Sequence, residues 1–464
     1  MSLFRSATET AGVIRRGEAS SAELVSAQLD RIRTTNPALN ALVEVHADEA
    51  LAAAGDADRA VCRDEPADAL HGVPISIKEA FEVSGFRSTW GNPIWAENRS
   101  DRDATVVSRL TGAGAIVVGT SNVAAMLGDF GQTTNPVYGR TVNPWDPGRA
   151  PGGSTGGGAA AVAAGLSFLD YGSDLAGSVR IPAAFCGVYG HKPTVGIVPG
   201  TGFQPPGPPA PPSERTYQVA FGPLARSASD IRAALGCTAG PEPPQSPALR
   251  WSLPASRHRR LQNFRVRYVL DHPMAPVTGD VGGALSDALD ALARAGVTLS
   301  AGWPDGVDPV ADVAGFGFHL NLYFAHLGEP TDQTLADVIE QERRRMSSRQ
   351  AWQACLTTDA DLFICPTVST VAIPHDDRPF GERAVETAHG PLPYSSLPFW
   401  IAHASLTGLP ALNAPVGTTS AGLPAGMQVL GPLFEDDTAI TFAELAADVT
   451  GGYTPPPIGA ATVG

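Results

Sequence analysis

Residues 151–180 constrain the fold more than any other part of this chain. The segment reads PGGSTGGGAAAVAAGLSFLDYGSDLAGSVR, in which serines and a threonine stand among closely spaced glycines and alanines. Glycine permits backbone conformations that other residues resist, and it lets a ligand approach the main chain closely. The segment therefore predicts either tight turns with no further role or a site where backbone N–H groups and hydroxyls face a substrate.

Strands and helices are expected to alternate along the chain. An apolar run around Ile75 and Ile77 is typical of a short buried strand, and residues 104–119 change from a helical pattern through a glycine turn into another such strand. The small-residue run at 156–165 predicts a helix that packs tightly against a sheet. This alternation favours an α/β fold.

Two amphipathic helices are expected before the first of these strands. Residues 20–37 predict one of them, with Ser20 or Ser21 as its N-cap and the Asn36-Pro37 pair as its end. Residues 48–60 predict the second.

Composition limits the classes of function. With 464 residues, 43% of them hydrophobic and 17% charged, the chain has ample material for a soluble globular core, as one large domain or as a domain with a cap. The net charge of −15 argues against nucleic acid and anionic lipid as partners. Neither a signal peptide nor a long apolar span is apparent, so we expect a cytoplasmic protein.

The five cysteines do not form a recognisable metal or disulfide pattern. Because no CxxC pair occurs, we interpret all five as buried thiols; they are Cys62, Cys186, Cys237, Cys355 and Cys365.

Two proline-rich segments interrupt the α/β pattern. Residues 202–218 predict an extended surface loop, and residues 373–400 form a second polar segment punctuated by prolines. Such long loops serve either as lids over a substrate or as plain connections.

Several familiar uses of a glycine- and serine-rich segment do not fit. A phosphate-binding P-loop needs a lysine after the glycines, and none follows here. Ser154 lies in GGSTG, which is not the GxSxG elbow of many hydrolases. A Ser-His-Asp triad stays open, but His71 and His191, the histidines near the candidate segments, are expected to be structural.

Lys78 offers another source of a base. It follows the apolar run VPISI directly, so its stem is expected to be buried and its ammonium desolvated. Desolvation favours the neutral amine, which is able to accept a proton. Taken alone, Lys78 is better explained as a surface lysine at a strand end.

Three blocks taken together resemble the amidase signature family of serine hydrolases. They are GVPISIK at 72–78, PGGSTGG at 151–157 and GSDLAGSVRIPAAFCGVYGHKPT at 172–194. Their order matches the family, as does the separation of Ser154 from Ser178, 178 − 154 = 24 residues. Further similarity covers most of the chain and is weakest from about 235 to 395; it includes NPWD at 143–146, GPLARS at 222–227, LTGLPALNAPVG at 406–417 and GLPAGMQVLG at 422–431.

The resemblance implies a catalytic role for three residues. Ser178 is the expected nucleophile, Ser154 the bridging serine that relays its proton, and Lys78 the neutral base and later acid. By the same resemblance, a cis peptide bond is expected between Gly153 and Ser154.

The resemblance also implies an oxyanion hole and supporting residues. The backbone N–H groups expected to hold the oxyanion belong to Leu175, Ala176, Gly177 and Ser178. The hydroxyl of Thr155 is expected to hydrogen-bond Lys78, and Asp174 and Arg180 to brace the loop.

Three departures from the family pattern bear on the substrate. Ala176 replaces a more usual glycine, and Ala125 stands roughly where relatives often carry an acidic residue. Ile181 and Pro182 follow Arg180, where amidotransferase members tend to have glutamine. A free-standing hydrolase is therefore favoured over an amidotransferase subunit with a partner chain. The presence of Lys78, Ser154 and Ser178 argues against a binding protein without activity.

The expected fold is a mixed twisted β-sheet covered on both sides by α-helices. Residues 1–464 are expected to form a single amidase domain, with a helical segment at 1–65 and variable substrate loops at about 200–220 and 300–400. The expected reaction cleaves small-molecule amides, with carbamates and esters as further candidates, without metal or cofactor and as a possible homodimer.

Phe, Leu, Met and Tyr are frequent in three segments that the resemblance places above the nucleophile. These segments are residues 124–130, 314–328 and 391–400. They form either plain core or the lining of a pocket, and a pocket of this composition favours neutral aryl or acyl groups.

Overall fold

Eleven strands form one mixed sheet in the part of the chain that the computed structural model describes, which is residues 2–63, 65, 68–206, 218–326 and 328–460. Their order is β1-β3-β2-β6-β8-β7-β14-β15-β11-β9-β10. The strands are β1 (Leu42–Val45), β2 (Pro74–Lys78), β3 (Ile116–Ser121), β6 (Leu169–Asp174), β7 (Tyr189–Lys192), β8 (Ala220–Ala225), β9 (Arg265–Tyr268), β10 (Thr298–Ala301), β11 (Leu362–Pro366), β14 (Ala411–Thr418) and β15 (Pro424–Leu430).

Parallel and antiparallel pairs both occur along this sheet. β3, β2 and β6 run parallel to one another, as do β11, β9 and β10, while the pairs between β6 and β11 are antiparallel. The prediction of a mixed α/β sheet is therefore confirmed. Two short hairpins lie outside it: β4 (Thr134–Asn135) with β5 (Gly139–Arg140), and β12 (Ala384–Thr387) with β13 (Gly390–Pro393).

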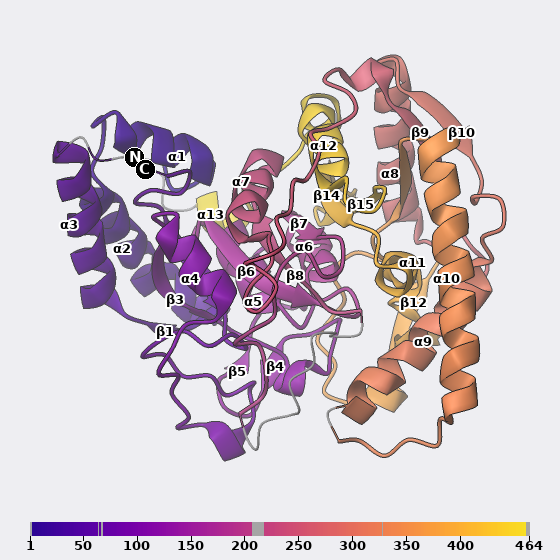
Figure 1. Cartoon of the computed structure of the whole chain (residues 1–464), viewed down its shortest axis with the longest axis horizontal. Coiled ribbons are helices and arrows are strands. Elements are labelled where there is room, and N and C mark those ends of the chain that lie inside the picture. The colour runs from indigo at the N-terminus through magenta and orange to yellow at the C-terminus, as the bar shows by residue number, and fades with distance from the viewer. Residues whose placement is uncertain (1, 64, 66–67, 207–217, 327, 461–464) are drawn as a thin grey trace.

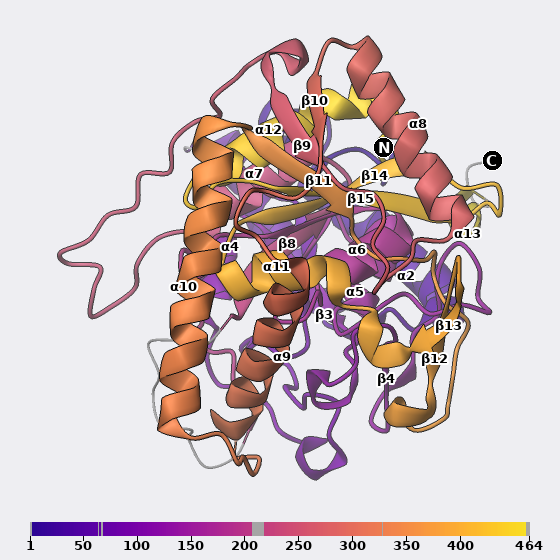
Figure 2. The ribbon, with the colours of Figure 1, turned by 90° about the vertical axis from the view of Figure 1, so that its right-hand side faces the viewer.

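Helices cover both faces of the sheet (Figures 1 and 2). One apolar layer joins α2, α3, α5 and α6, and a larger one joins α4, α7, α8 and α12. The helices are α1 (Ala7–Arg15), α2 (Ser21–Leu39), α3 (Ala47–Cys62), α4 (Thr105–Gly112), α5 (Gly156–Ala163), α6 (Arg180–Cys186), α7 (Ala228–Thr238), α8 (Gly279–Arg294), α9 (Pro309–His326), α10 (Leu335–Thr358), α11 (Phe399–Thr407), α12 (Asp436–Thr450) and α13 (Pro457–Ala460).

The first long helix begins as expected and ends later than expected. Ser20 caps α2, and its hydroxyl accepts a hydrogen bond from the Glu23 N–H in a capping box. Pro37 lies inside the helix, so the prediction that α2 ends at Asn36-Pro37 is wrong. The end comes at Asn40, whose φ of 51° is left-handed.

Two further expectations need correction. Residues 373–400 are not merely irregular, because they contain the β12–β13 hairpin and the start of α11. Cys62 is exposed and Cys237 is half-buried, so the interpretation of all five cysteines as buried is wrong for these two. Cys62 occupies the last turn of α3, where the helix faces solvent. Most of the loop expected at 202–218 lies outside the described residues.

Two kinds of feature are absent from the described residues. None of their helices combines the length and apolarity that a membrane crossing requires. No group of three His, Cys, Asp or Glu side chains among them is arranged to hold a metal ion.

Candidate active site

Two neighbouring strands bring Lys78 to the glycine-rich turns. β2 and β6 pair in parallel, with Ile77 opposite Tyr171, so their carboxyl ends lie side by side. Lys78 is the last residue of β2 and is completely buried. Its Nζ donates hydrogen bonds to Ser154 Oγ at 2.8 Å and to Ser173 Oγ at 2.9 Å.

This environment favours the neutral amine of Lys78. Burial lowers the pKa of Lys78 to about 7, against the opposing effect of the Asp170 and Asp174 carboxylates. Desolvation penalises the charged form because an ammonium loses its hydration in a low-dielectric interior. A substantial fraction of the side chain is therefore able to accept a proton near neutral pH.

Glycines shape the turn that carries Ser154. Gly152 has a φ of 82°, and a Cβ on Gly153 would lie 2.3 Å from the Gln132 carbonyl oxygen. The expected cis peptide bond between Gly153 and Ser154 is present. Side chains larger than hydrogen do not fit here, which explains the glycine pair.

Ser178 lies on the turn between β6 and α6, beside the Ser154 turn. The Thr155 N–H donates a hydrogen bond to the Ser178 carbonyl oxygen at 3.2 Å. Both serines are buried, and Ser178, at 6% exposure, is slightly closer to solvent than Ser154, at 1%. The structure therefore places the Ser178 turn against the Ser154 turn, while Lys78 contacts Ser154 directly.

We call residues 175–178 the oxyanion turn after the role expected for them, and one of their four backbone N–H groups is already occupied. Gly177 has a φ of 86°, and its N–H donates to Asp174 Oδ1 at 3.0 Å. No hydrogen bond between described residues uses the N–H groups of Leu175, Ala176 or Ser178. These three groups are the ones available to a substrate oxygen.

Asp174 and Arg180 form a fully buried ion pair behind this turn. Arg180 Nη2 lies 2.8 Å from Asp174 Oδ1, and its Nε donates to Asp174 Oδ2 at 3.0 Å. The same guanidinium donates to Gln428 Oε1 on β15 and Ser405 Oγ on α11. The pair thus ties the turn to the C-terminal half of the sheet. The sequence did not indicate Gln428 or Ser405.

Thr155 does not contact Lys78 in the expected way. Its Oγ1 is buried and has no hydrogen-bond partner among the described residues. Ser173 takes that place instead, since it lies at the end of β6 next to the Lys78 ammonium. The prediction for Thr155 is therefore wrong. The available signal for Ser173 was its position within the same block, five residues before Ser178.

The other candidate bases and nucleophiles have partners elsewhere or are inert. His191 Nε2 lies 3.0 Å from Asp436 Oδ1, and His71 Nε2 lies 3.1 Å from the Ala57 carbonyl oxygen. Burial raises the pKa of the Cys186 thiol far above its usual range, so its thiolate is not formed near neutral pH.

The three apolar segments meet beside the oxyanion turn. Ala176 belongs to a buried cluster that includes Phe316 of α9, Ile401 of α11 and Tyr394, which precedes α11. The half-buried side chains of Phe130 and Leu320 pack against it. We call this set the apolar wall.

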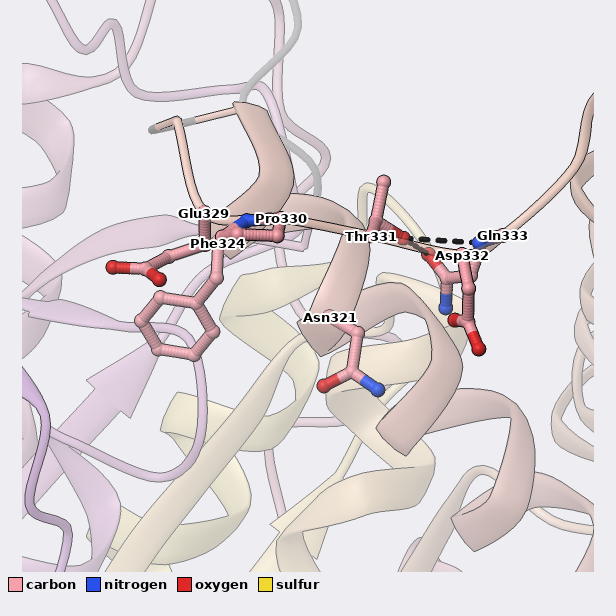
Figure 3. A pocket seen from close by; sticks show the side chains of 7 residues that line it. All are labelled: Asn321, Phe324, Glu329, Pro330, Thr331, Asp332 and Gln333. Atoms are coloured by element: carbon pink, nitrogen blue, oxygen red, sulfur yellow. Dashed lines mark hydrogen bonds between the residues drawn. The ribbon is translucent and has the colours of Figure 1, made fainter.

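A recess at the far end of α9 is separate from these residues. It measures about 590 Å³, and Figure 3 shows side chains from the end of α9 and the chain that follows it around the opening. The lining residues are Asn321, Phe324, Glu329, Pro330, Thr331, Asp332 and Gln333. None of the three candidate catalytic residues contributes to it.

Comparisons with known proteins place the chain in the class of α/β enzymes that act on amides. A family model named Amidase matches residues 23–318 and 314–440. The chain belongs to the amidase signature family.

Two relatives and one solved structure illustrate the range of this family. An acylamidase of Rhodococcus erythropolis is 32% identical over 91% of each chain. A glutamyl-tRNA(Gln) amidotransferase subunit of Thermosynechococcus vestitus is 31% identical over 91% of this chain and 93% of its own. The crystal structure of a bacterial aryl acylamidase superposes with a TM-score of 0.78 at 24% identity, covering 96% of each chain.

Proposed function

We propose that this chain is a serine hydrolase that cleaves the C–N bond of neutral, hydrophobic amides through an acyl-enzyme on Ser178. The observation that carries the proposal is the pair of short contacts from the buried Lys78 Nζ to Ser154 and Ser173. A neutral lysine held on a serine hydroxyl is a base positioned to activate a nucleophile.

The proposed reaction transfers one proton in each direction. Ser178 Oγ attacks the amide carbonyl carbon while its proton passes through Ser154 Oγ to Lys78 Nζ. The tetrahedral oxyanion receives hydrogen bonds from the turn at 175–178. Its collapse breaks the C–N bond, and the amine leaves with the proton that Lys78 returns through Ser154. Water then cleaves the ester by the same route and regenerates Ser178.

The composition of the apolar wall supports a neutral substrate. Phe316 and Leu320 offer hydrocarbon surface next to Ala176. Two charged side chains lie beside Tyr394 of the apolar wall, and they are paired with each other. Arg383 Nη1 lies 2.6 Å from Asp129 Oδ2. This ion pair leaves no unpaired charge to bind the charged groups of a free amino acid such as glutamine. An aryl or acyl group, in contrast, gains free energy when its apolar surface is buried.

Reaction with a fluorophosphonate tests the catalytic proposal. We expect one covalent adduct, located on Ser178 by peptide mass spectrometry and absent in Ser178→Ala. An adduct on another serine, or equal labelling of the variant, would contradict it. A panel of an acyl anilide, an aryl carbamate and an ester under the same conditions then defines the bond that is cleaved fastest.

The amidotransferase relative gives one alternative a specific basis. A chain of that kind would act on glutamine and need a partner chain. Purified protein that hydrolyses glutamine faster than any anilide, or that gains activity only with a partner, would favour this alternative.

A further inference from the structure

A second buried carboxylate lies beside the candidate base. Asp170 on β6 stands directly opposite Ser76 on β2, and Ser76 Oγ donates to Asp170 Oδ2 at 2.6 Å. Ser76 and Lys78 are two residues apart on one strand, so their side chains leave the same face of the sheet. Asp170 and Lys78 are both completely buried. The carboxylate and the amine therefore share one closed compartment.

A glycine on α5 makes room for this carboxylate. A Cβ added to Gly158 would lie 2.1 Å from Asp170 Oδ1. Neither Asp170 Oδ1 nor Ser121 Oγ, which stands on β3 opposite Lys78, makes a hydrogen bond of good geometry to any described residue. Two hydroxyl groups, those of Ser76 and Ser121, nevertheless face the Asp170 carboxylate and favour its charged form.

Few other charges reach Lys78 in this compartment. β6 supplies two carboxylates, Asp170 and Asp174, and Asp174 is already paired with Arg180. The helix above, α5, consists of glycine, alanine and valine. Glu79, which follows the end of β2, accepts hydrogen bonds from the backbone N–H groups of residues 89 and 90. Asp170 forms no ion pair of its own among the described residues, and Lys78 is the cation that acts on it.

We propose that Asp170 is a positioning residue that sets the charge of Lys78, and with it the pH range of hydrolysis, without touching the substrate. The inference rests on the proposed function in so far as Lys78 is the base. An ionised Asp170 favours the ammonium form of Lys78 and so opposes the lowering of its pKa by burial. Burial raises the pKa of Asp170 to about 6, close to that of Lys78, so the two groups titrate as a coupled pair.

The pH dependence of fluorophosphonate labelling tests this coupling. The labelling rate of wild type is expected to rise with pH, and Asp170→Asn to move the midpoint of this rise to lower pH by about one unit. Asp230→Asn is the matched control, because Asp230 is also fully buried but accepts its hydrogen bonds from α1. Its midpoint is expected to equal that of wild type. An unchanged midpoint in Asp170→Asn, or an equal shift in the control, would overturn the inference.

A second measurement reads the same coupling without catalysis. Thermal unfolding of wild type, Lys78→Met, Asp170→Asn and the double variant completes a mutant cycle. We expect Asp170→Asn to change Tm by different amounts in wild type and in the Lys78→Met variant. Equal changes in both backgrounds would overturn the inference. If wild type shows no labelling at Ser178, the proposed function fails, while the cycle still decides whether Asp170 acts on Lys78.

Discussion

Lys78 Nζ and Ser154 Oγ lie 2.8 Å apart in a compartment from which solvent is excluded. A protonated lysine in this position would place an ammonium among groups that only partly solvate it, which costs free energy. A neutral lysine has a lone pair that accepts the Ser154 proton when Ser154 takes one from the nucleophile. The distance therefore links the burial of the lysine to its proposed chemistry.

The activity of the wild-type protein is expected to rise with pH on a midpoint near 7. The pKa of Lys78 is lowered to about 7, so the protonated, inactive form predominates below this pH and the neutral base above it. Lys78→Ala is expected to lose activity by about 10² to 10⁴-fold, the usual effect of removing a general base. Its remaining activity should lack this midpoint. The measurement is kcat/KM for an acyl anilide across the pH range, and a variant with the wild-type profile would identify another base.

Ser178→Ala is expected to reduce kcat by about 10⁴-fold or more, since no acyl-enzyme forms. The free energy of unfolding should change by about 1 kcal/mol, because only one hydroxyl is lost. Turnover of an anilide and urea denaturation give the two values. Cys186→Ala serves as the control and should keep the fluorophosphonate reaction, since Cys186 is a buried thiol. Normal turnover by a folded Ser178→Ala protein would remove Ser178 from the mechanism.

Ser173 and Thr155 form a matched pair for testing which hydroxyl holds the base. Ser173→Ala removes a 2.9 Å contact to Lys78 Nζ and is expected to lower kcat by about tenfold, equivalent to a hydrogen bond of about 1.4 kcal/mol. Thr155→Val removes a hydroxyl that has no partner among the described residues and should change kcat by less than about threefold. The reverse order of effects would restore the original expectation for Thr155.

The contrast between these two residues shows what the sequence was able to predict. The order and spacing of the motifs predicted that Lys78 and the glycine-rich turns lie close together, and the structure shows the Lys78–Ser154 contact and the backbone contact between Thr155 and Ser178. Which neighbouring hydroxyl reaches Nζ depends on side-chain direction at the end of β6, and spacing alone does not contain it. For the same reason, the use of the Gly177 N–H by Asp174 became visible only in three dimensions.

Side-chain hydrogen bonds, both local and long-range, limited the prediction elsewhere. Pro37 was expected to end its helix, yet Asn36 closes the chain beyond it by accepting hydrogen bonds from the N–H groups of Ala41 and Leu42. The contacts of Arg180 with Gln428 and Ser405 span more than 220 residues. No local pattern indicates partners at such a separation.

Arg180→Met is expected to lower the free energy of unfolding by about 3 to 5 kcal/mol, because it leaves the Asp174 carboxylate buried without a countercharge. Activity should fall together with stability, since Asp174 also accepts the Gly177 N–H behind the oxyanion turn. Chemical denaturation measures the loss. Arg378→Met is the control, because the Arg378–Asp376 pair is screened by solvent and its loss should change the free energy of unfolding far less. Similar losses in both variants would show that the buried pair has no special role.

Substrate preference is expected to depend on the apolar wall. If Leu320 lies along the bound acyl or aryl group, Leu320→Ala removes about 2 kcal/mol of burial and should raise KM for an acyl anilide by up to about 30-fold, with kcat less affected. Val310→Ala, at an exposed position of the same helix, is the control and should leave KM unchanged.

The substrate preference itself is measured as kcat/KM for an anilide, an aryl carbamate and glutamine. Wild-type protein should favour the two aryl substrates, since burial of a ring is the main source of binding free energy at a hydrocarbon surface. A preference for glutamine, or equal effects of the two variants, would exclude the wall as the determinant of specificity.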